Sequence, residues 1–492
     1  MKKLIQLLFF IIIAISLMAC SSTSTTIQSE VAVSADTSET GELNSEIETN
    51  DSIITVSPGD VVLDNDSILI SEAGTYYISG TLENGQIIID ADNSSDIQLI
   101  LNDVSINSNY SAAIYVSQAS NLNITTNSDS ELTVNANISS SDNTIDGVIF
   151  SKSDLTFDGS ATLTIKSEYI HGIVGKDDIE FLDGSYEIEV GKDGIQANDS
   201  VSIIDSTMNI LVSNDGIQVK NDENTDKGYV YLENSNIILN TGEDGISASN
   251  YVEVISGEYT IDSNLDGIQA DSYINIVDGS FDITTGGGYQ GVLNIITVGE
   301  GSGGSISETD KLTDSMKAIK GNDITVIDGE IVISSYEDGF NADNDILING
   351  GNILINAGDE AITAKNSLII NNGVINIENG YEGLEAVDIT INGGDTTINV
   401  LDDGINGGES YSLVTIAGGD LKVTSQGDGL DSNGDMIISG GNIILDVSAI
   451  YTGGDGNVDV SGTLTYTGGT IVDTSGNAID PTEEISFSGK RH

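Results

Sequence analysis

Hydrophobic and polar residues alternate in short runs along most of the chain, and clusters of Asn, Asp and Gly separate the runs. The segment 338–358, DGFNADNDILINGGNILINAG, contains three such runs and no apolar stretch with the length or spacing of a helix. Alternation of this kind is typical of β-strands with one buried face. Each such segment therefore predicts three short strands joined by three turns.

The strand pattern returns at a nearly constant interval. An acidic residue, a glycine and an aliphatic residue, or a close variant of this triplet, recur about every 21 to 22 residues apart from a few insertions. A fixed period of this length indicates stacked units that cannot bury their apolar faces alone. The triplets and their variants begin at Asp146, His171, Asp193, Asp215, Asp244, Asp266, Lys317, Asp338, Glu360, Glu382, Asp403 and Asp428.

We therefore predict an all-β protein, a single right-handed parallel β-helix (solenoid) with about 21–22 residues per coil over residues 51–480. Leucine-rich repeats have a similar period but require a Leu-x-x-Leu-x-Leu pattern that is absent, and hexapeptide or nonapeptide coils hold about 18 residues. Glycine is expected where corners need a positive φ. The only prolines, Pro58 and Pro481, lie near the ends of this range, because the strands between them need their backbone N–H groups. Residues 481–492 are the predicted C-terminal tail.

The first residues have the features of a bacterial export signal. Lys2 and Lys3 precede an apolar run that is shorter than the roughly 20 residues of a membrane span. The run ends in Leu-Met-Ala-Cys, which resembles a lipobox and makes Cys20 the expected lipidation site; an uncleaved anchor helix is the alternative. We predict a lipoprotein signal peptide at 1–19, a flexible Ser/Thr-rich acidic tether at 20–50, and an extracytoplasmic, lipid-anchored protein at the cell surface.

The chain is strongly acidic, with 15 Lys and Arg against 78 Asp and Glu and a formal net charge of -63. This charge repels phosphate backbones and anionic lipid headgroups, so we expect no nucleic acid partner and contact with the membrane only through the lipid. Because 38% of the residues are hydrophobic and the aliphatic residues recur regularly, the acidity does not indicate disorder. We expect a folded monomer.

Acidic residues at equivalent positions of adjacent coils raise an electrostatic problem. Coils stack about 4.8 Å apart, so carboxylates one period apart, such as those of Asp193 and Asp215, are expected to face each other. Calcium prefers oxygen ligands and can sit between two such residues. The alternative is that Asp-Gly is favourable turn chemistry with its carboxylates in solvent. The predicted Ca²⁺ ligands are Asp193, Asp215, Asp244, Asp266, Asp338, Glu360, Glu382, Asp403 and Asp428.

Two basic residues replace acids in this row of triplets. Lys317 is expected to offset the charges of Asp266 and Asp338, or to contact a substrate carboxylate, and Lys320 lies three residues further on. His171 also occupies an acid position. A solvated corner histidine is expected there, with a ligand or catalytic role as the alternative.

A Gly- and Ser-rich insertion, residues 284–316, interrupts the period; it either walls a ligand groove or is merely tolerated. Sugar-binding surfaces favour large rings, and the chain has no Trp. Tyr336 and Tyr381, two coils apart beside acids of the row, are the best aromatic candidates, with a surface tyrosine stack as the alternative. The predicted carbohydrate-binding residues are Tyr336, Tyr381, Lys317 and Lys320.

Several segments taken in order resemble a known family. They are the opening repeat at 68–125, HGIVGKDDIEF, KAIKGNDITVIDG after the Gly-rich insertion, and GDGLDSNGDMIISGG at 427–441. Together they are similar to the bacterial carbohydrate-binding domain-containing family of calcium-binding, pectate-lyase-like β-helices, over about 55–475. The resemblance implies a right-handed β-helix, bound calcium and a polysaccharide ligand such as polygalacturonate or cellulose. After residue 445 the similarity weakens.

A binding module and an enzyme are both compatible with this fold. Pectate lyases on it use Arg or Lys to remove a proton next to a carboxylate, with calcium acidifying that proton. The only arginine is Arg491, in the tail, which leaves Lys317 or Lys320 as a base, and no basic partner accompanies Asp402 and Asp403 for hydrolysis. We therefore expect a calcium-loaded, polysaccharide-binding lipoprotein without catalytic activity. A calcium-dependent pectate lyase and a structural spacer or adhesin are the alternatives.

Overall fold

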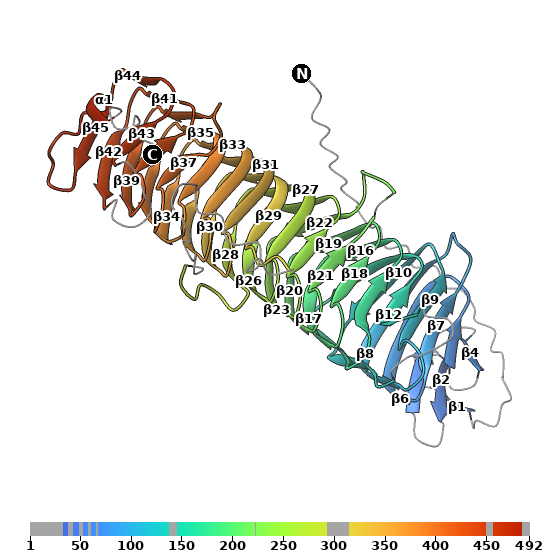
Figure 1. Ribbon diagram of the computed structural model, residues 1–492. Helices are drawn as coiled ribbons and strands as arrows, with labels where there is room; N and C mark the ends of the chain where they lie inside the picture. The colour runs from blue at the N-terminus through green and yellow to red at the C-terminus, as the bar shows by residue number, and fades with distance from the viewer. Residues whose placement is uncertain are drawn as a thin grey trace.

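The computed structural model describes residues 67–136, 145–221, 223–292, 314–448 and 456–484, together with the backbone of four earlier strands. Its strands stack into one elongated solenoid that runs from the N-terminal to the C-terminal coils (Figure 1). The only helix in the described residues is the short α1, Pro481–Glu484. The prediction of an all-β parallel β-helix is therefore confirmed.

Each coil contributes to three rows of parallel strands. One coil consists of β18 (Ile195–Ala197), β19 (Ser200–Ile204) and β20 (Ser206–Val212), and the next coil repeats it 22 residues later, with Ile195 opposite Ile217. Several longer strands bend through two rows. Those of the first two coils are β6 (Gly74–Glu83) and β8 (Asp96–Ser108), and those of the later coils are β27 (Ile268–Ile276), β29 (Ile319–Val326), β31 (Phe340–Ile348), β33 (Ile362–Ile370) and β35 (Leu384–Ile391).

The remaining strands each belong to one row. The first row contains β5 (Ser67–Ile70), β7 (Gln86–Asp90), β9 (Ile114–Gln118), β12 (Gly147–Ser151), β15 (His171–Gly175), β18, β21 (Ile217–Val219), β24 (Ile246–Ala248), β37 (Ile405–Gly407), β40 (Leu430–Ser432) and β43 (Val458–Val460). The second row contains β10 (Asn121–Thr126), β13 (Asp154–Gly159), β16 (Asp178–Phe181), β19, β22 (Tyr229–Glu233), β25 (Tyr251–Val254), β38 (Leu413–Ile416), β41 (Asp435–Ile438) and β44 (Leu464–Tyr466). The third row contains β11 (Ser130–Val134), β14 (Thr162–Ser167), β17 (Gly184–Val190), β20, β23 (Ser235–Thr241), β26 (Gly257–Ser263), β28 (Ser280–Thr285), β30 (Glu330–Ser335), β32 (Asn352–Ala357), β34 (Val374–Asn379), β36 (Asp395–Asn399), β39 (Asp420–Ser425), β42 (Asn442–Val447) and β45 (Thr470–Asp473).

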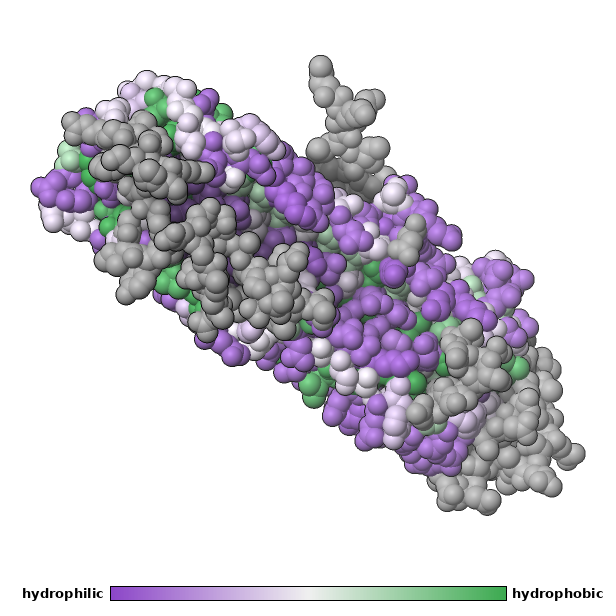
Figure 2. Space-filling view, viewed as in Figure 1, coloured by the Kyte–Doolittle hydropathy of each residue, from purple (hydrophilic) through white to green (hydrophobic). Residues whose placement is uncertain are grey.

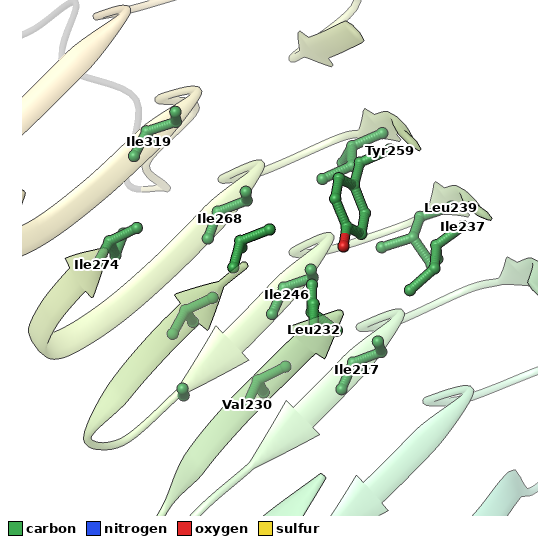
Figure 3. Packing of buried hydrophobic residues seen from close by; sticks show 14 of the residues in the cluster. Ile217, Val230, Leu232, Ile237, Leu239, Ile246, Tyr259, Ile268, Ile274 and Ile319 are labelled. Carbon is green, nitrogen blue, oxygen red and sulfur yellow. The ribbon is translucent and has the colours of Figure 1, made fainter. Parts of the chain in front are cut away.

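The core is built from columns of identical positions. Ile217, Ile246, Ile268 and Ile319 lie in register on four successive first-row strands, and all four are fully buried (Figure 3). Burial of such a side chain is worth about 1.5–3 kcal/mol, so every coil stabilises the two beside it. The alternate residues face outward, and the surface seen in Figure 2 is largely hydrophilic.

The glycine of the repeated triplet is required for a reason that differs from the expected one. Gly194, Gly216 and Gly245 do not have the positive φ predicted for corner glycines; positive φ values occur instead at other corners, for example at Gly257 and Gly329. A Cβ on Gly216 would lie 2.6 Å from the carbonyl oxygen of Gly245 on the next coil. The triplet glycine therefore permits close stacking of the coils.

The N-terminal part of the chain contains antiparallel strands before the first coil. The antiparallel strands β1 (Val33–Thr37) and β2 (Leu43–Glu48) lie inside the predicted tether 20–50, while the signal peptide 1–19 and Cys20 lie outside the described residues. Further antiparallel strands, β3 (Ile53–Ser57) and β4 (Val61–Asp64), precede the first coil. No helix among the described residues is long and apolar enough to cross a membrane.

The predicted insertion and the C-terminal coils lie in the second half of the solenoid. The predicted insertion begins where β28 ends, and most of it, residues 293–313, lies outside the described residues. The C-terminal coils, where the sequence led us to expect a weaker family resemblance, continue the solenoid, because β43, β44 and β45 pair in parallel with β40, β41 and β42.

Candidate functional site

The acids of the repeated triplets form a row along one corner of the solenoid, immediately before the first-row strands. Backbone hydrogen bonds fix their alignment: Gly216 donates to the carbonyl of Asp244 at 3.0 Å, and Gly245 donates to that of Asp266 at 2.9 Å. We call the aligned first positions of the triplets from His171 to Asp428 the acid row, in which His171 and Lys317 are the two basic members. The structure therefore places the predicted ligands on adjacent coils, as the period required.

In the N-terminal half of the acid row, protein groups bind the carboxylates. Oδ1 of Asp215 accepts a hydrogen bond from the backbone N–H of Asp244 at 2.9 Å, and Oδ1 of Asp244 accepts one from Asp266 at 2.9 Å. Oδ2 of Asp215 accepts a second bond from the side-chain amide of Gln218 at 2.5 Å. Asp215 is only 4% exposed, so the alternative in which these carboxylates point freely into solvent is wrong.

The glutamine three residues after the acid has the same function one coil earlier. Nε2 of Gln196 donates to Oδ2 of Asp193 at 3.2 Å and to Oε1 of Gln218 at 3.1 Å. The Asp-Gly-Ile-Gln sequence thus brings its own hydrogen-bond donor to the carboxylates of Asp193 and Asp215. Carboxylates that accept several N–H bonds have part of their charge compensated without a metal ion.

Two lysines separate this half from the C-terminal half. Nζ of Lys320 lies 2.9 Å from Oδ2 of Asp266, and Nζ of Lys317 lies 2.5 Å from Oδ2 of Asp338 and 3.8 Å from Oε2 of Glu337. Burial disfavours the charged ammonium of Lys317, but the neighbouring carboxylates outweigh it and raise its pKa above the usual range. Lys317 therefore offsets the charge of Asp338, as the sequence led us to expect. A protonated ammonium cannot act as the base of a lyase.

The C-terminal half contains two clusters of carboxylates. One oxygen from each of Asp338, Asp359 and Glu360 lies within 4.8 Å of the others, and Asp428, Asp431 and Asp459 form a second group of this kind. Asp359 precedes a row acid directly, whereas Asp431 follows one by three residues, at the position where three of the four N-terminal acids are followed by glutamine. We call the segment from Asp338 to Asp459 the acidic segment.

Some oxygens in the acidic segment have no hydrogen-bond partner among the described residues. They are the buried Oδ1 atoms of Asp338, Asp359 and Asn406 and the buried Oγ1 of Thr396. Asp338 is 2% exposed, and an unpaired carboxylate oxygen at such a position is costly. A hard cation such as Ca²⁺ prefers negatively charged oxygen ligands. The carboxylates of the acidic segment therefore fit this ion.

Burial raises carboxyl pKa values in both halves of the acid row, and in the N-terminal half it raises that of Asp215 to about 6 and that of Asp244 to about 7. Burial, reinforced by neighbouring carboxylates, raises the pKa of Asp359 and Asp403 to about 7 and that of Asp431 to about 8. The same causes hold the pKa values of Glu360 and Glu382 well above their usual range. Without a cation, these carboxyls partly retain protons near neutral pH.

The predicted ligands therefore fall into two sets. Asp338 and Glu360 lie together in the first carboxylate group, and Asp428 lies in the second. Glu382 accepts a bond from Nδ2 of Asn406 at 2.9 Å, and Asp403 accepts one from the N–H of Asp428 at 2.6 Å. The four earlier acids, Asp193, Asp215, Asp244 and Asp266, interact with amides, backbone N–H groups or lysine.

Sequence reasoning missed three acids of these groups, Asp359, Asp431 and Asp459. Asp431 could have been found, because it occupies the outward position three residues after a triplet acid. A third group, Asp154, Asp177 and Asp178, lies outside the acid row, and Nζ of Lys227 is 3.9 Å from Asp177.

His171 begins the acid row and is buried, in contrast to the solvated histidine that was expected. Its Nδ1 lies 3.2 Å from the backbone nitrogen of Asp193 and 3.0 Å from Oδ2 of the same residue, while Nε2 is 3.6 Å from Oδ2 of Asp146. Nδ1 takes the place that Oδ1 has in the aspartates of the row. The histidine is therefore a structural member of the row.

The two tyrosines predicted to contact a sugar do not form an open aromatic surface in the structure. Tyr381 is 7% exposed, and its hydroxyl donates to Oδ2 of Asp402 at 2.5 Å, so its ring offers no open face for a sugar. Tyr336 is half-buried at the same corner two coils earlier. A different set of tyrosines, Tyr229, Tyr251 and Tyr273, forms a surface stack on the second row of strands. Their spacing of 22 residues equals the repeat period and was a usable signal.

The stacked coils and the continuous row of carboxylates define an acidic parallel β-helix. Residues 64–256, 247–361 and 359–489 match the family model described as carbohydrate-binding domain-containing protein. These segments span most of the chain, which therefore belongs to the carbohydrate-binding domain-containing family.

A curated relative from Acetivibrio thermocellus carries the same description. It is 27% identical over 157 residues, which are 30% of this chain and 54% of the relative, so the chain spans about half the length of that protein. A solved structure, the polysaccharide lyase-like protein from C. thermocellum in its gadolinium derivative, is 25% identical with a TM-score of 0.40. The match covers 47% of this chain and 88% of that chain.

The pairing of Lys317 with Asp338 can be tested by removing the positive charge. Lys317→Gln should lower the free energy of unfolding by about 3–5 kcal/mol in chelator, because it leaves a buried carboxylate without its partner. Adding Asp338→Asn should recover much of this loss. Lys365→Gln is the control, because Lys365 is 72% exposed and pairs with the exposed Asp343, an interaction worth about 1 kcal/mol or less. Denaturant unfolding measures all three; equal effects at both lysines would contradict the assignment.

The raised carboxyl pKa values predict how stability depends on pH in chelator. The pKa of Asp244 rises from 3.8 to about 7, with burial as the largest cause, so the folded state holds more protons than the unfolded state between these values. Stability should therefore be greatest below about pH 4 for this group and decline as the pH rises towards 7. We expect the melting temperature at pH 5 to exceed that at pH 8 by several degrees. A higher melting temperature at pH 8 would be inconsistent with protonated carboxyls in the folded state.

Proposed function

We propose that this protein is a cell-surface lipoprotein that binds acidic polysaccharide through calcium held in the acidic segment, without catalytic activity. Membership of a carbohydrate-binding family supports the ligand class. The observation that carries the calcium proposal is the group Asp338, Asp359 and Glu360, in which two carboxylate oxygens are buried without partners. Lys317 compensates one of the three negative charges of this group through Asp338, and a divalent cation would compensate the remaining two.

Calcium would also resolve the charge problem of an anionic ligand. A chain with a formal charge of -63 repels a polyuronate such as polygalacturonate. Ca²⁺ takes 6–8 oxygen ligands, which is more than three carboxylates supply in their simplest mode, so uronate oxygens and water can complete the shell. The protein's own residues would hold the ion and orient it, and the ligand would approach a corner whose charge is locally reduced.

The protonation state of the lysines argues against lyase chemistry. A lyase base must be neutral before it takes the proton next to the uronate carboxylate. The carboxylates around Lys317 keep its ammonium protonated, and Lys320 is in an ion pair with Asp266. Binding without bond cleavage is therefore the function that these residues support best, and lyase activity is the alternative.

Pull-down on polygalacturonate tests the calcium and ligand proposals together. Binding should require calcium and disappear in chelator. Asp359→Asn combined with Glu360→Gln should weaken binding at least about tenfold, because two of the three carboxylates of the proposed ion site lose their charge. Glu258→Gln, an exposed acid on the third row, is the control and should bind like the wild type. Chelator-insensitive binding would refute the calcium proposal, and formation of unsaturated uronate products would show that the protein is a lyase.

Lipid anchoring rests on the lipobox-like end of the signal and has its own test. Cys20→Ala should release the protein from the membrane fraction into the periplasm or medium, because the lipid would be its only attachment. Wild-type protein should remain with the membrane in the same fractionation. Retention of the Cys20→Ala variant would favour an uncleaved anchor helix.

A further inference from the structure

Three tyrosines form a regular row on the outer surface of the second row of strands. Tyr229, Tyr251 and Tyr273 lie at the starts of β22 and β25 and in the second half of β27, in consecutive coils. Their ring centroids are 4.8 and 4.7 Å apart, and the ring planes deviate from parallel by only 1° and 3°. We call these residues the tyrosine row. No other described second-row position carries three aromatic residues in successive coils.

The geometry of the tyrosine row determines which of its groups a ligand can reach. The inner ring faces cover one another, and Ser200 and Asp323 lie in register beyond the two ends, so the ring edges and the hydroxyls are the groups that a ligand can reach. Tyr273 at one end is 38% exposed. None of the three hydroxyls has a hydrogen-bond partner among the described residues. Burial raises the pKa of Tyr251 to about 12, so its phenol keeps a proton to donate at neutral pH.

A second line of polar groups accompanies the tyrosine row on the same strands. The hydroxyl of Tyr231 donates to Oε2 of Glu233 at 2.6 Å, and Nδ2 of Asn275 donates to Oε1 of Glu253 at 3.0 Å. These contacts hold the side chains in fixed positions before any ligand binds. Stacked neighbours immobilise the tyrosines as well, so little side-chain entropy would be lost on binding.

The acidic residues around the tyrosine row favour an uncharged ligand over an anionic one. Glu233 and Glu253 lie on the same strands, and Asp323 is in register with Tyr273 on the next coil. The nearest lysine in the sequence, Lys227, pairs with Asp199. An anionic polysaccharide would be repelled at this surface, whereas a neutral one would meet apolar ring edges and repeated hydrogen-bonding groups.

We propose that the tyrosine row is a second glycan-binding site, which takes a neutral, unbranched polysaccharide lying along the solenoid axis and does not require calcium. The proposal rests on the proposed function, since it assigns a second ligand surface to a polysaccharide-binding protein. One hydroxyl per coil would meet the repeating hydroxyls of the polymer, and the ring edges would contact its C–H groups. The tyrosine row replaces Tyr336 and Tyr381 as the aromatic contact surface.

Native electrophoresis through gels that contain hydroxyethylcellulose, an uncharged soluble glucan, tests the proposal on the full folded chain. The wild type should be retarded equally in calcium and in chelator. Tyr229→Ser combined with Tyr273→Ser should bind at least about tenfold more weakly, because two of the three ring edges are lost. Tyr411→Ser is the matched control, because Tyr411 is 72% exposed and lies outside the row. It should behave like the wild type.

A tryptophan reporter gives a second measurement that does not depend on loss of binding. The chain has no Trp, so Tyr273→Trp introduces the only indole and its emission reports on the row alone. Hydroxyethylcellulose should shift this emission to shorter wavelength, and polygalacturonate in calcium should leave it unchanged. Melting curves of all variants establish that they are folded.

The outcomes separate this inference from the proposed function. No retardation of the wild type by hydroxyethylcellulose, or undiminished retardation of the double variant, would overturn the tyrosine-row site. Calcium-dependent binding to polygalacturonate by the same double variant would show that the acidic segment works independently of the tyrosine row. Equal loss of both glycans in that variant, or loss of neutral-glucan binding in chelator, would also overturn the inference.

Discussion

Parallel stacking places every side chain directly beside its counterpart on the next coil, one strand spacing away. For aliphatic and aromatic residues this proximity is favourable, and it builds the isoleucine columns and the tyrosine row. For carboxylates it brings like charges together, which destabilises the fold unless another group intervenes. The acid row therefore governs the electrostatics of the molecule. Each coil has to compensate a charge that the repeat itself creates.

The protein uses three forms of compensation along this one corner. Amides and backbone N–H groups bind carboxylates such as Asp215, and lysines bind Asp266 and Asp338. Proton retention is a third internal means in both halves, as the raised pKa values of Asp244 and Asp431 indicate. The proposed divalent cation would be an external means. The two halves differ in that buried carboxylate oxygens without a partner among the described residues, those of Asp338 and Asp359, occur in the C-terminal half.

The sequence period was sufficient to predict the fold, because a repeat of three short strands leaves few other ways to bury its apolar residues. It also placed the acids on adjacent coils. It could not reveal that Gly216 is needed for close approach rather than for a positive φ, since both demands select the same residue. Nor could the triplet position show that Tyr381 turns inward to bond Asp402. Asp359 and Asp431 were missed because the prediction considered one position per coil and not the residues that lie beside that position in space.

We propose that only the C-terminal half of the acid row holds a cation that stabilises the fold. Hydrogen exchange followed by mass spectrometry, comparing protein in calcium with protein in chelator, tests it most directly because local opening is measured segment by segment. Backbone amides in first-row strands from β31 to β40 should exchange more slowly in calcium. Those of β18 and β21, beside the amide-bound acids, should be unchanged. Equal protection of both halves, or no change in either, would contradict the account.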